Sequence, residues 1–323
     1  MNEAFFAGPL RVRIEASEAP LRDKLAETLG LYDRSWDGPF LDVVLSARSV
    51  TAGAEMVDGA FLRCARMTVD AAGGEFHATT RCGARARSSG TAARTWSIEV
   101  PEAAVASRRL EELEDIVGLA LTAGWRTAGW VPLHAAAVIR DGVCPILCAG
   151  SGGGKSTLTA ALVRSGWRAL GDDKLLLRNE GTTCELRALL HTFNLHPRTS
   201  EWFPEVGDLT LLPPYSSWTE KRKFRSDGTW PEASAPRACP THVVRVRRES
   251  GRRGVCVREL PRAEIFPTLL KQIAIPSDRT AAAGILATVA KTVAGVRGLD
   301  LEIGDDAYRD PECLAGFERE LLQ

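Results

Sequence analysis

The pattern of hydrophobic and polar positions divides the chain into a β-rich first part and an α/β second part. Through about the first 100 residues, apolar and polar positions alternate over short stretches separated by glycine-rich or polar breaks, which is typical of half-exposed strands. The predicted strands are 10–14, 41–45, 61–69, 76–85 and 96–100, with one helix at 21–29. From Pro101 an Ala-, Leu- and Glu-rich run predicts a helix to about residue 123, which joins the two parts.

The second part begins with two apolar runs, 132–138 and 145–148, which predict short strands on either side of a turn. A glycine-rich loop follows, and then a predicted helix at 155–164 and strands at 167–170 and 175–177. This order predicts an α/β core. Further along, the sequence predicts loops and short elements over 181–240, a hairpin over 243–260, a helix over 277–296, a strand over 299–303 and a final helix from 311. We therefore predict a β-rich N-terminal domain at 1–125, ending in the connecting helix, and an α/β domain at 126–323.

Composition narrows the possible partners. Hydrophobic residues make up 45% of the 323 residues, and Lys+Arg and Asp+Glu both number 41, so no net charge favours nucleic acid or an acidic membrane. No apolar run reaches the roughly 18 residues needed to span a bilayer, and the amino terminus lacks the features of a secretory signal. The eight cysteines form no Cys-x-x-Cys pair, so they are expected to be reduced and mostly buried. We predict a cytoplasmic protein that binds neither membrane nor nucleic acid, with homo-oligomerisation left open.

The glycine-rich loop is the strongest chemical signal in the sequence. Residues 149–157 read AGSGGGKST and nearly fit the phosphate-binding pattern G-x-x-x-x-G-K-[ST], with Ala149 at the first glycine position. Glycines let the backbone curl so that its N–H groups point at phosphate oxygens, and the helix that follows adds its positive dipole end. The alternative is a glycine-rich turn with an incidental Lys-Ser, but the strand before the loop and the helix after it favour phosphate binding. The predicted phosphate-binding residues are Gly150, Ser151, Gly152, Gly153, Gly154, Lys155, Ser156 and Thr157.

Two aspartates and a histidine flank this loop in the sequence. Asp172 and Asp173 end the strand that follows the loop helix, so one helix and one return bring them back beside the loop. Phosphoryl transfer to a hydroxyl needs a carboxylate for the metal and a group that accepts the proton, and adjacent carboxylates point in different directions on a strand. A polar turn is the alternative for this pair. His134 precedes the small residues 135–137, which leave room for a ligand, although a lone histidine is more often structural.

These motifs together resemble the kinase domain of HPr kinase/phosphorylase and its relatives, which include serine kinases that act on peptides or metabolites. The resemblance covers about residues 130–178 and implies an α/β P-loop kinase core of the HPr kinase/phosphoenolpyruvate carboxykinase type, with ATP and Mg²⁺ as cofactors. It implies the following roles: Lys155 on the phosphates, Ser156 and Asp173 on Mg²⁺, Asp172 as general base, and His134 beside the γ-phosphate. The chain departs from the family at Ala149, and it lacks the downstream glycine-rich signature used for the protein HPr, which argues against HPr as the substrate.

Three functions are compatible with the sequence. The first is a kinase that phosphorylates a hydroxyl, such as a serine, on a peptide, small protein or metabolite. The second is an NTPase that couples hydrolysis to a conformational or assembly task, and the third is a nucleotide-binding regulator without turnover. The early Asp172-Asp173 pair favours the kinase. The basic segment Lys221-Arg222-Lys223, with Arg225, is either a solvated charge run or a clamp over phosphates.

Overall fold

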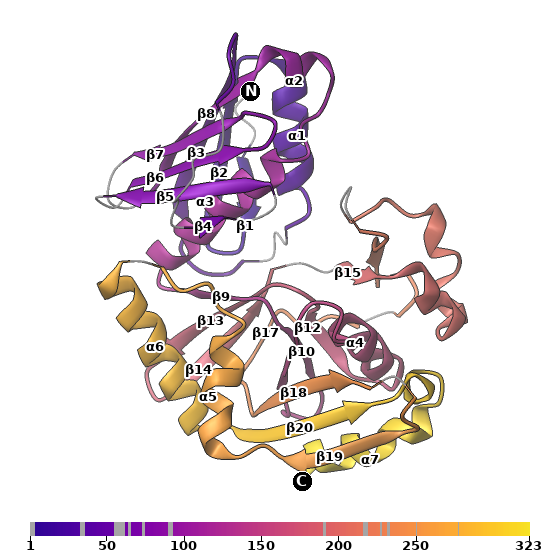
Figure 1. Ribbon diagram of the computed structural model, residues 1–323. Coiled ribbons are helices and arrows are strands. Elements are labelled where there is room, and N and C mark those ends of the chain that lie inside the picture. Colours follow the sequence, from indigo (N-terminus) through magenta and orange to yellow (C-terminus); the bar gives the residue numbers. More distant parts are fainter. Residues whose placement is uncertain are drawn as a thin grey trace. The chain divides into compact units, whose positions relative to one another are not determined.

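The chain forms a mixed α/β structure with several sheets (Figure 1). The computed structural model describes residues 4–32, 36–54, 62–63, 66–72, 75–89, 93–189, 192–215, 219–226, 228–230, 233–249, 251–276 and 278–323. Contacts divide it into two compact units, Met1–Trp130 with Pro276–Ala282, and Val131–Ile275 with Ala283–Gln323. None of the helices in the described residues is both long enough and apolar enough to cross a membrane.

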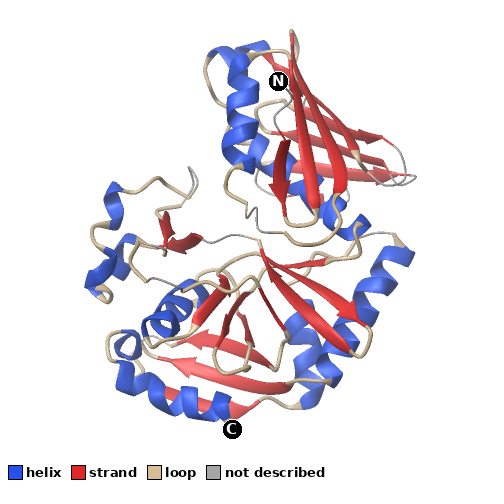
Figure 2. Cartoon of the chain, turned by 180° about the vertical axis from the view of Figure 1, so that it is seen from behind, coloured by secondary structure: helices blue, strands red, loops and turns tan. Residues whose placement is uncertain are grey.

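The first unit is an eight-stranded sheet in the order β1-β2-β3-β8-β7-β6-β5-β4, with β2, β3 and β8 parallel to one another. Figures 1 and 2 show its helices beside one face of the sheet. The buried leucines of α1 (Leu21, Leu25 and Leu29) face this sheet because their spacing places them on one side of the helix. The elements are β1 (Ala4–Ala7), β2 (Leu10–Ala16), α1 (Ala19–Leu29), β3 (Leu41–Val50), β4 (Leu62–Arg63), β5 (Met67–Ala72), β6 (Glu75–Thr80), β7 (Arg85–Ser89), β8 (Thr95–Pro101), α2 (Glu102–Ala106) and α3 (Leu113–Thr127).

Three elements predicted here as continuous are interrupted in the structure. The strand predicted at 76–85 covers most of β6, a turn and the first residue of β7, because the chain turns at Gly83 with φ 84°. The strand predicted at 61–69 is divided between β4 and β5, and Phe61 lies outside the described residues. The helix predicted from Pro101 is divided into α2 and α3, with Arg108 in the left-handed region at φ 53° between them.

The second unit has three layers. Its main sheet has the order β12-β10-β11-β18-β20-β19, in which β11, β18 and β20 are parallel. Leu158 and Leu162 of α4 and Phe317 of α7 share a core with one face of this sheet. Ile265 and Leu269 of α5 and Val289 of α6 share a second core with the opposite face. The elements are β10 (Ala136–Ile139), β11 (Pro145–Cys148), α4 (Lys155–Arg164), β12 (Arg168–Gly171), β18 (His242–Arg248), β19 (Val255–Glu259), α5 (Arg262–Leu270), α6 (Arg279–Ala294), β20 (Arg297–Ile303), η4 (Asp305–Tyr308) and α7 (Pro311–Leu322).

Two smaller sheets complete this unit. The first has the order β17 (Arg237–Ala238), β14 (Thr183–Ala188), β13 (Leu175–Glu180) and β9 (Val131–Leu133). The second is a hairpin of β15 (Thr192–Leu195) and β16 (Arg222–Arg225), with the short turns η1 (Pro197–Glu201), η2 (Pro204–Val206) and η3 (Leu209–Leu211) between its strands. The region 181–240, predicted as loops and short elements, contains these short strands and turns. The predicted helix at 277–296 is α6, whose first turn is capped by Asp278, while Ser277 lies outside the described residues.

Candidate active site

The glycine-rich loop joins β11 to α4 at the carboxyl end of the parallel strands. Gly152 and Gly154 have φ of 74° and 89°, a conformation that glycine adopts without steric cost. A Cβ on Gly154 would also lie 2.5 Å from the Tyr308 Oη, so no larger residue fits there. Ala149 does not have a positive φ, which explains why this position needs no glycine. Gly150, Ser151 and Gly152 are exposed, whereas Ser156 and Thr157 in the first turn of α4 are half-buried.

Lys155 is the first residue of α4 and is only 7% exposed. Its Nζ donates a hydrogen bond to the Ala149 carbonyl at 2.9 Å and lies 3.5 Å from the His134 Nε2. Burial lowers the pKa of Lys155, although the Asp173 and Asp172 carboxylates raise it, and the Lys221 charge lowers it further. The side chain is thus anchored across the loop, and its ammonium group has no salt bridge among those found in the described residues.

Asp173 and His134 form a pair beside this lysine. The His134 Nδ1 lies 3.1 Å from the Asp173 Oδ1, and the Tyr215 hydroxyl donates to the Asp173 Oδ2 at 3.4 Å. The His134 side chain is 56% exposed. Partial loss of water around its ring lowers its pKa, the Asp173 carboxylate raises it, and the Lys155 charge lowers it further. The Gln272 amide, oriented with its nitrogen toward the two carbonyls, donates to His134 O at 2.8 Å and Ala149 O at 3.3 Å. Gln272 therefore ties the histidine backbone to the start of the loop.

Asp172 is buried, at 2% exposed, directly after β12. Its Oδ2 accepts a hydrogen bond from the Asn194 backbone N–H at 2.7 Å, and its Oδ1 has no hydrogen-bond partner among the described residues. Burial raises the pKa of Asp172 to about 6, and the Asp173 charge raises it as well, while the Asn194 N–H, the Ser156 hydroxyl and the Lys221 charge lower it. A buried carboxylate with one free oxygen is a candidate for contact with a metal ion or a substrate proton.

Four of the residues predicted from sequence are thus in contact or interact electrostatically: His134, Lys155, Asp172 and Asp173. Ser156 is near enough to Asp172 to affect its pKa. Sequence reasoning missed Asn194, Gln272 and Tyr308, because none belongs to a motif and each reaches the site from a distant segment. From sequence, Tyr215 is one of several aromatics that could line a pocket, although core packing is the preferred interpretation for them. The Tyr308 ring stacks on Trp202 at 5.3 Å between centroids, and its buried hydroxyl has no partner in the described part of the chain.

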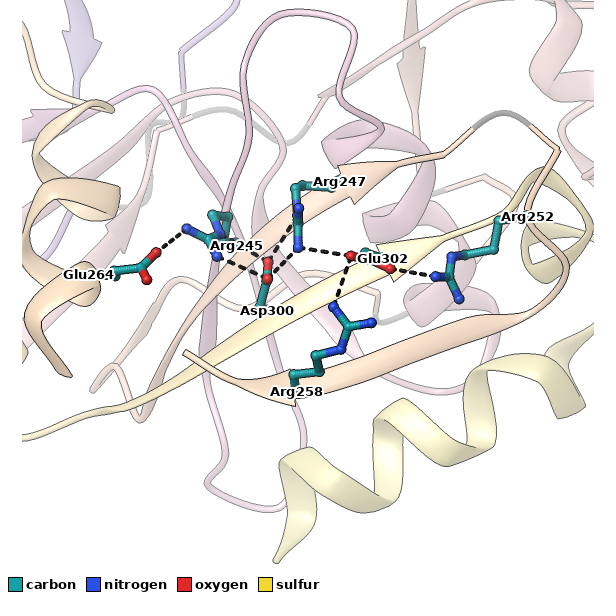
Figure 3. Close-up of polar contacts among 7 residues, drawn as sticks. All are labelled: Arg245, Arg247, Arg252, Arg258, Glu264, Asp300 and Glu302. Carbon is teal, nitrogen blue, oxygen red and sulfur yellow. Dashed lines mark hydrogen bonds and ion pairs between the residues drawn. The ribbon is translucent and has the colours of Figure 1, made fainter. Parts of the chain in front are cut away.

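A second group of charges lies on neighbouring strands of the same sheet (Figure 3). Arg245 on β18 pairs in register with Cys148, the last residue of β11, and makes two hydrogen bonds of 2.9 Å to Asp300 on β20. Arg247 also bonds to Asp300, at 2.5 Å. Glu302 accepts hydrogen bonds from the arginines at 247, 252 and 258, and Glu264 of α5 accepts from Arg245. We call these seven residues (Arg245, Arg247, Arg252, Arg258, Glu264, Asp300 and Glu302) the arginine–carboxylate network.

No protein-family model matches the chain, and no curated protein matches it in sequence. Among solved structures, it is similar to the Hpr(Ser) kinase/phosphatase from Coxiella burnetii, at 9% sequence identity and a TM-score of 0.32, over 59% of this chain and 99% of the other. This is a distant structural relationship only.

Proposed function

We propose that the protein is a kinase that uses ATP and Mg²⁺ to transfer the γ-phosphoryl group to a hydroxyl, such as a serine, of a peptide, small protein or metabolite. The observation that supports this most directly is the convergence of a buried, anchored lysine with a buried carboxylate that has a free oxygen. Lys155 is the first residue of α4, and Asp172 directly follows β12, the next strand along the chain. The Asp172 carboxylate nevertheless interacts with the Lys155 charge and raises the pKa of the lysine. A phosphate cradle beside a base is what transfer to a hydroxyl requires.

The loop supplies the phosphate cradle in this proposal. The backbone N–H groups of residues 150–157 and the amino-terminal end of α4 would bind the phosphates, because they present partial positive charge to an anion. Lys155 would neutralise charge on the β- and γ-phosphates. Its burial keeps water from competing for the ammonium group, which strengthens that contact.

Oxygen donors suitable for Mg²⁺ lie beside the cradle. The Ser156 hydroxyl and the Asp173 carboxylate would hold the ion, and the free Oδ1 of Asp172 is a further oxygen donor close to Ser156. Among the residues that the structure describes, no three His, Cys, Asp or Glu side chains are arranged to hold a metal ion. Mg²⁺ commonly takes one or two carboxylates and completes its shell with substrate phosphates and water, so this donor set fits it. When bound, the ion would supply positive charge to the phosphate oxygens.

Asp172 is the proton acceptor in this mechanism. Its pKa of about 6 leaves it ionised at neutral pH while keeping it basic enough to accept a proton. The acceptor O–H bond breaks as its oxygen forms a bond to the γ-phosphorus, and the proton moves to Asp172. The bond between the γ-phosphorus and the bridging oxygen breaks, and ADP leaves with that electron pair. His134, held by Asp173, would lie beside the γ-phosphoryl oxygens.

The test is a transfer assay with γ-labelled ATP and Mg²⁺, in which wild type is compared with Lys155→Ala on peptide and small-molecule pools. We expect label on an acceptor with wild type and a loss on the order of 10³-fold with the variant, since charge stabilisation at the phosphoryl group is removed. Free phosphate without a labelled acceptor would instead support an NTPase. Tight ATP binding without any turnover would support a regulator.

A further inference from the structure

The β15–β16 hairpin returns to the active site from a segment far along the chain. The Asn194 N–H on β15 bonds to Asp172, and the Tyr215 hydroxyl bonds to Asp173. These contacts join residues 22 and 42 positions apart in the sequence. Both aspartates are therefore held by one segment, residues 192–225, which we call the insert.

Lys221 lies directly opposite Tyr215 in this insert. The Tyr215 N–H donates to the Lys221 carbonyl at 2.8 Å, and the Lys223 N–H donates to the Pro213 carbonyl at 3.0 Å. Pro214 and Arg222 form the antiparallel bridge between those two bonds. Directly opposed residues of an antiparallel pair project to the same face. Since the Tyr215 side chain reaches Asp173, the half-buried Lys221 side chain is directed to the active-site face as well.

Electrostatic coupling agrees with this geometry. The positive charge of Lys221 lowers the pKa values of His134, Lys155 and Asp172, as a cation close to all three would. Two lysines thus act on one site, and their mutual repulsion is unfavourable in the free protein. A polyanion bound between them would remove that repulsion, because each ammonium group would then face phosphate oxygens.

We infer that Lys221 is a second phosphate-contacting lysine, which binds the γ-phosphoryl oxygens of the nucleotide from the side opposite the glycine-rich loop. This inference rests on the proposed function. Lys155 lies inside the loop, where it would serve the β- and γ-phosphates together. Lys221 approaches with the residues that hold Asp172 and Asp173, and so it serves the phosphoryl group being transferred. Lys221 therefore makes ATP bind more tightly relative to ADP.

The experiment compares ATP and ADP dissociation constants and kcat for wild type, Lys221→Gln, Lys221→Arg and Arg168→Gln. Arg168 is exposed at the start of β12, at the opposite end of that strand from Asp172, so its variant removes the same charge from a position outside the basic segment. We expect Lys221→Gln to weaken ATP binding about tenfold and to lower kcat on the order of 10²-fold, with ADP binding changed less than about threefold. Lys221→Arg restores most of the ATP preference, and Arg168→Gln resembles wild type.

The outcomes separate this inference from the proposed function. Equal losses for ATP and ADP, or a Lys221→Gln variant that matches Arg168→Gln, would overturn the role of Lys221 while leaving the kinase intact. A wild-type protein that neither binds ATP nor releases its γ-phosphate would overturn the proposed function, and this inference with it. Salt titration gives a second measurement: the salt dependence of ATP affinity should be weaker in Lys221→Gln than in wild type, because one cation that contacts the γ-phosphate is missing, whereas the salt dependence of ADP affinity should be the same in both. An unchanged salt dependence of ATP affinity in Lys221→Gln would contradict the inference.

Discussion

The active site and the arginine–carboxylate network lie on the same six-stranded mixed sheet but organise their charges in opposite ways. In the network each carboxylate faces arginines: Asp300, whose side chain is 8% exposed, is bonded by Arg245 and Arg247. In the active site Lys155 and Lys221 repel each other, and the Asp172 Oδ1 has no partner among the described residues. The first arrangement is complete without a ligand, whereas the second gains partners only when an anion and a metal bind.

The two aspartates show this difference in their ionisation. Burial acts to raise the pKa of Asp300, but hydrogen bonds from Arg245 and Arg247 outweigh it, so the pKa is lowered. Burial also acts on Asp172, and there the Asn194 N–H, the Ser156 hydroxyl and the Lys221 charge do not compensate, so the pKa rises to about 6. Satisfied charges stabilise a fold, and charges left unsatisfied by the protein indicate a functional site.

We expect the largest difference between Asp172 and Asp300 in turnover, when each is replaced by asparagine. Asp172→Asn removes the proton acceptor, and we expect phosphoryl transfer to fall about 10²–10⁴-fold while ATP binding changes little. Asp300→Asn should leave kcat/KM of the folded enzyme within about threefold, since within the described part of the chain the Asp300 carboxylate bonds to Arg245 and Arg247 rather than to the loop residues. Steady-state kinetics on both variants checks this. Unchanged turnover in Asp172→Asn would refute its role as the base.

Stability should respond to these substitutions with opposite signs. The raised pKa means that folded Asp172 retains its proton more readily than the unfolded chain, so its ionisation destabilises the protein as pH rises from about 4 to above 6. Asp172→Asn should raise the free energy of unfolding at pH 7 by about 2 kcal/mol, with the gain vanishing below about pH 4.

Asp300→Asn should instead destabilise. Its carboxylate has a lowered pKa, so its contribution is present above the unfolded pKa and is lost as pH falls through the folded pKa. Its arginine partners are a third or more exposed, which limits the expected cost at pH 7 to about 1–2 kcal/mol. Urea denaturation between pH 3 and pH 8 measures the free energy of unfolding of both variants. Changes of the same sign for Asp172→Asn and Asp300→Asn at neutral pH would contradict the comparison.

The smallest effect is expected at the rim of the network. Arg258 is 60% exposed and bonds to Glu302 at 3.3 Å, so Arg258→Gln should cost no more than about 0.5 kcal/mol. That cost should disappear in about 1 M salt, where exposed charges are screened. A loss of several kcal/mol in the same denaturation assay would show that the network acts as one cooperative unit.

Sequence alone predicted those parts of the fold whose signal is local. The strand, glycine-rich loop and helix around Lys155 could be read directly, because positive φ at Gly152 and Gly154 and the start of α4 depend on neighbouring residues. The hydrophobic pattern predicted the ends of elements less well where a single turn of the backbone ends a strand or a helix. Gly83 and Arg108 each interrupt an element that hydrophobic periodicity made continuous.

Tertiary structure decided how the site is completed. Asp172 and Asp173 could be proposed from their position after the loop helix, but their different environments depend on Asn194 and Tyr215, which arrive through the hairpin. The free oxygen of Asp172, its raised pKa and the approach of Lys221 all follow from burial and from contacts between distant segments. Local sequence propensity does not predict such contacts, because desolvation and long-range electrostatic interactions arise only once the chain has folded.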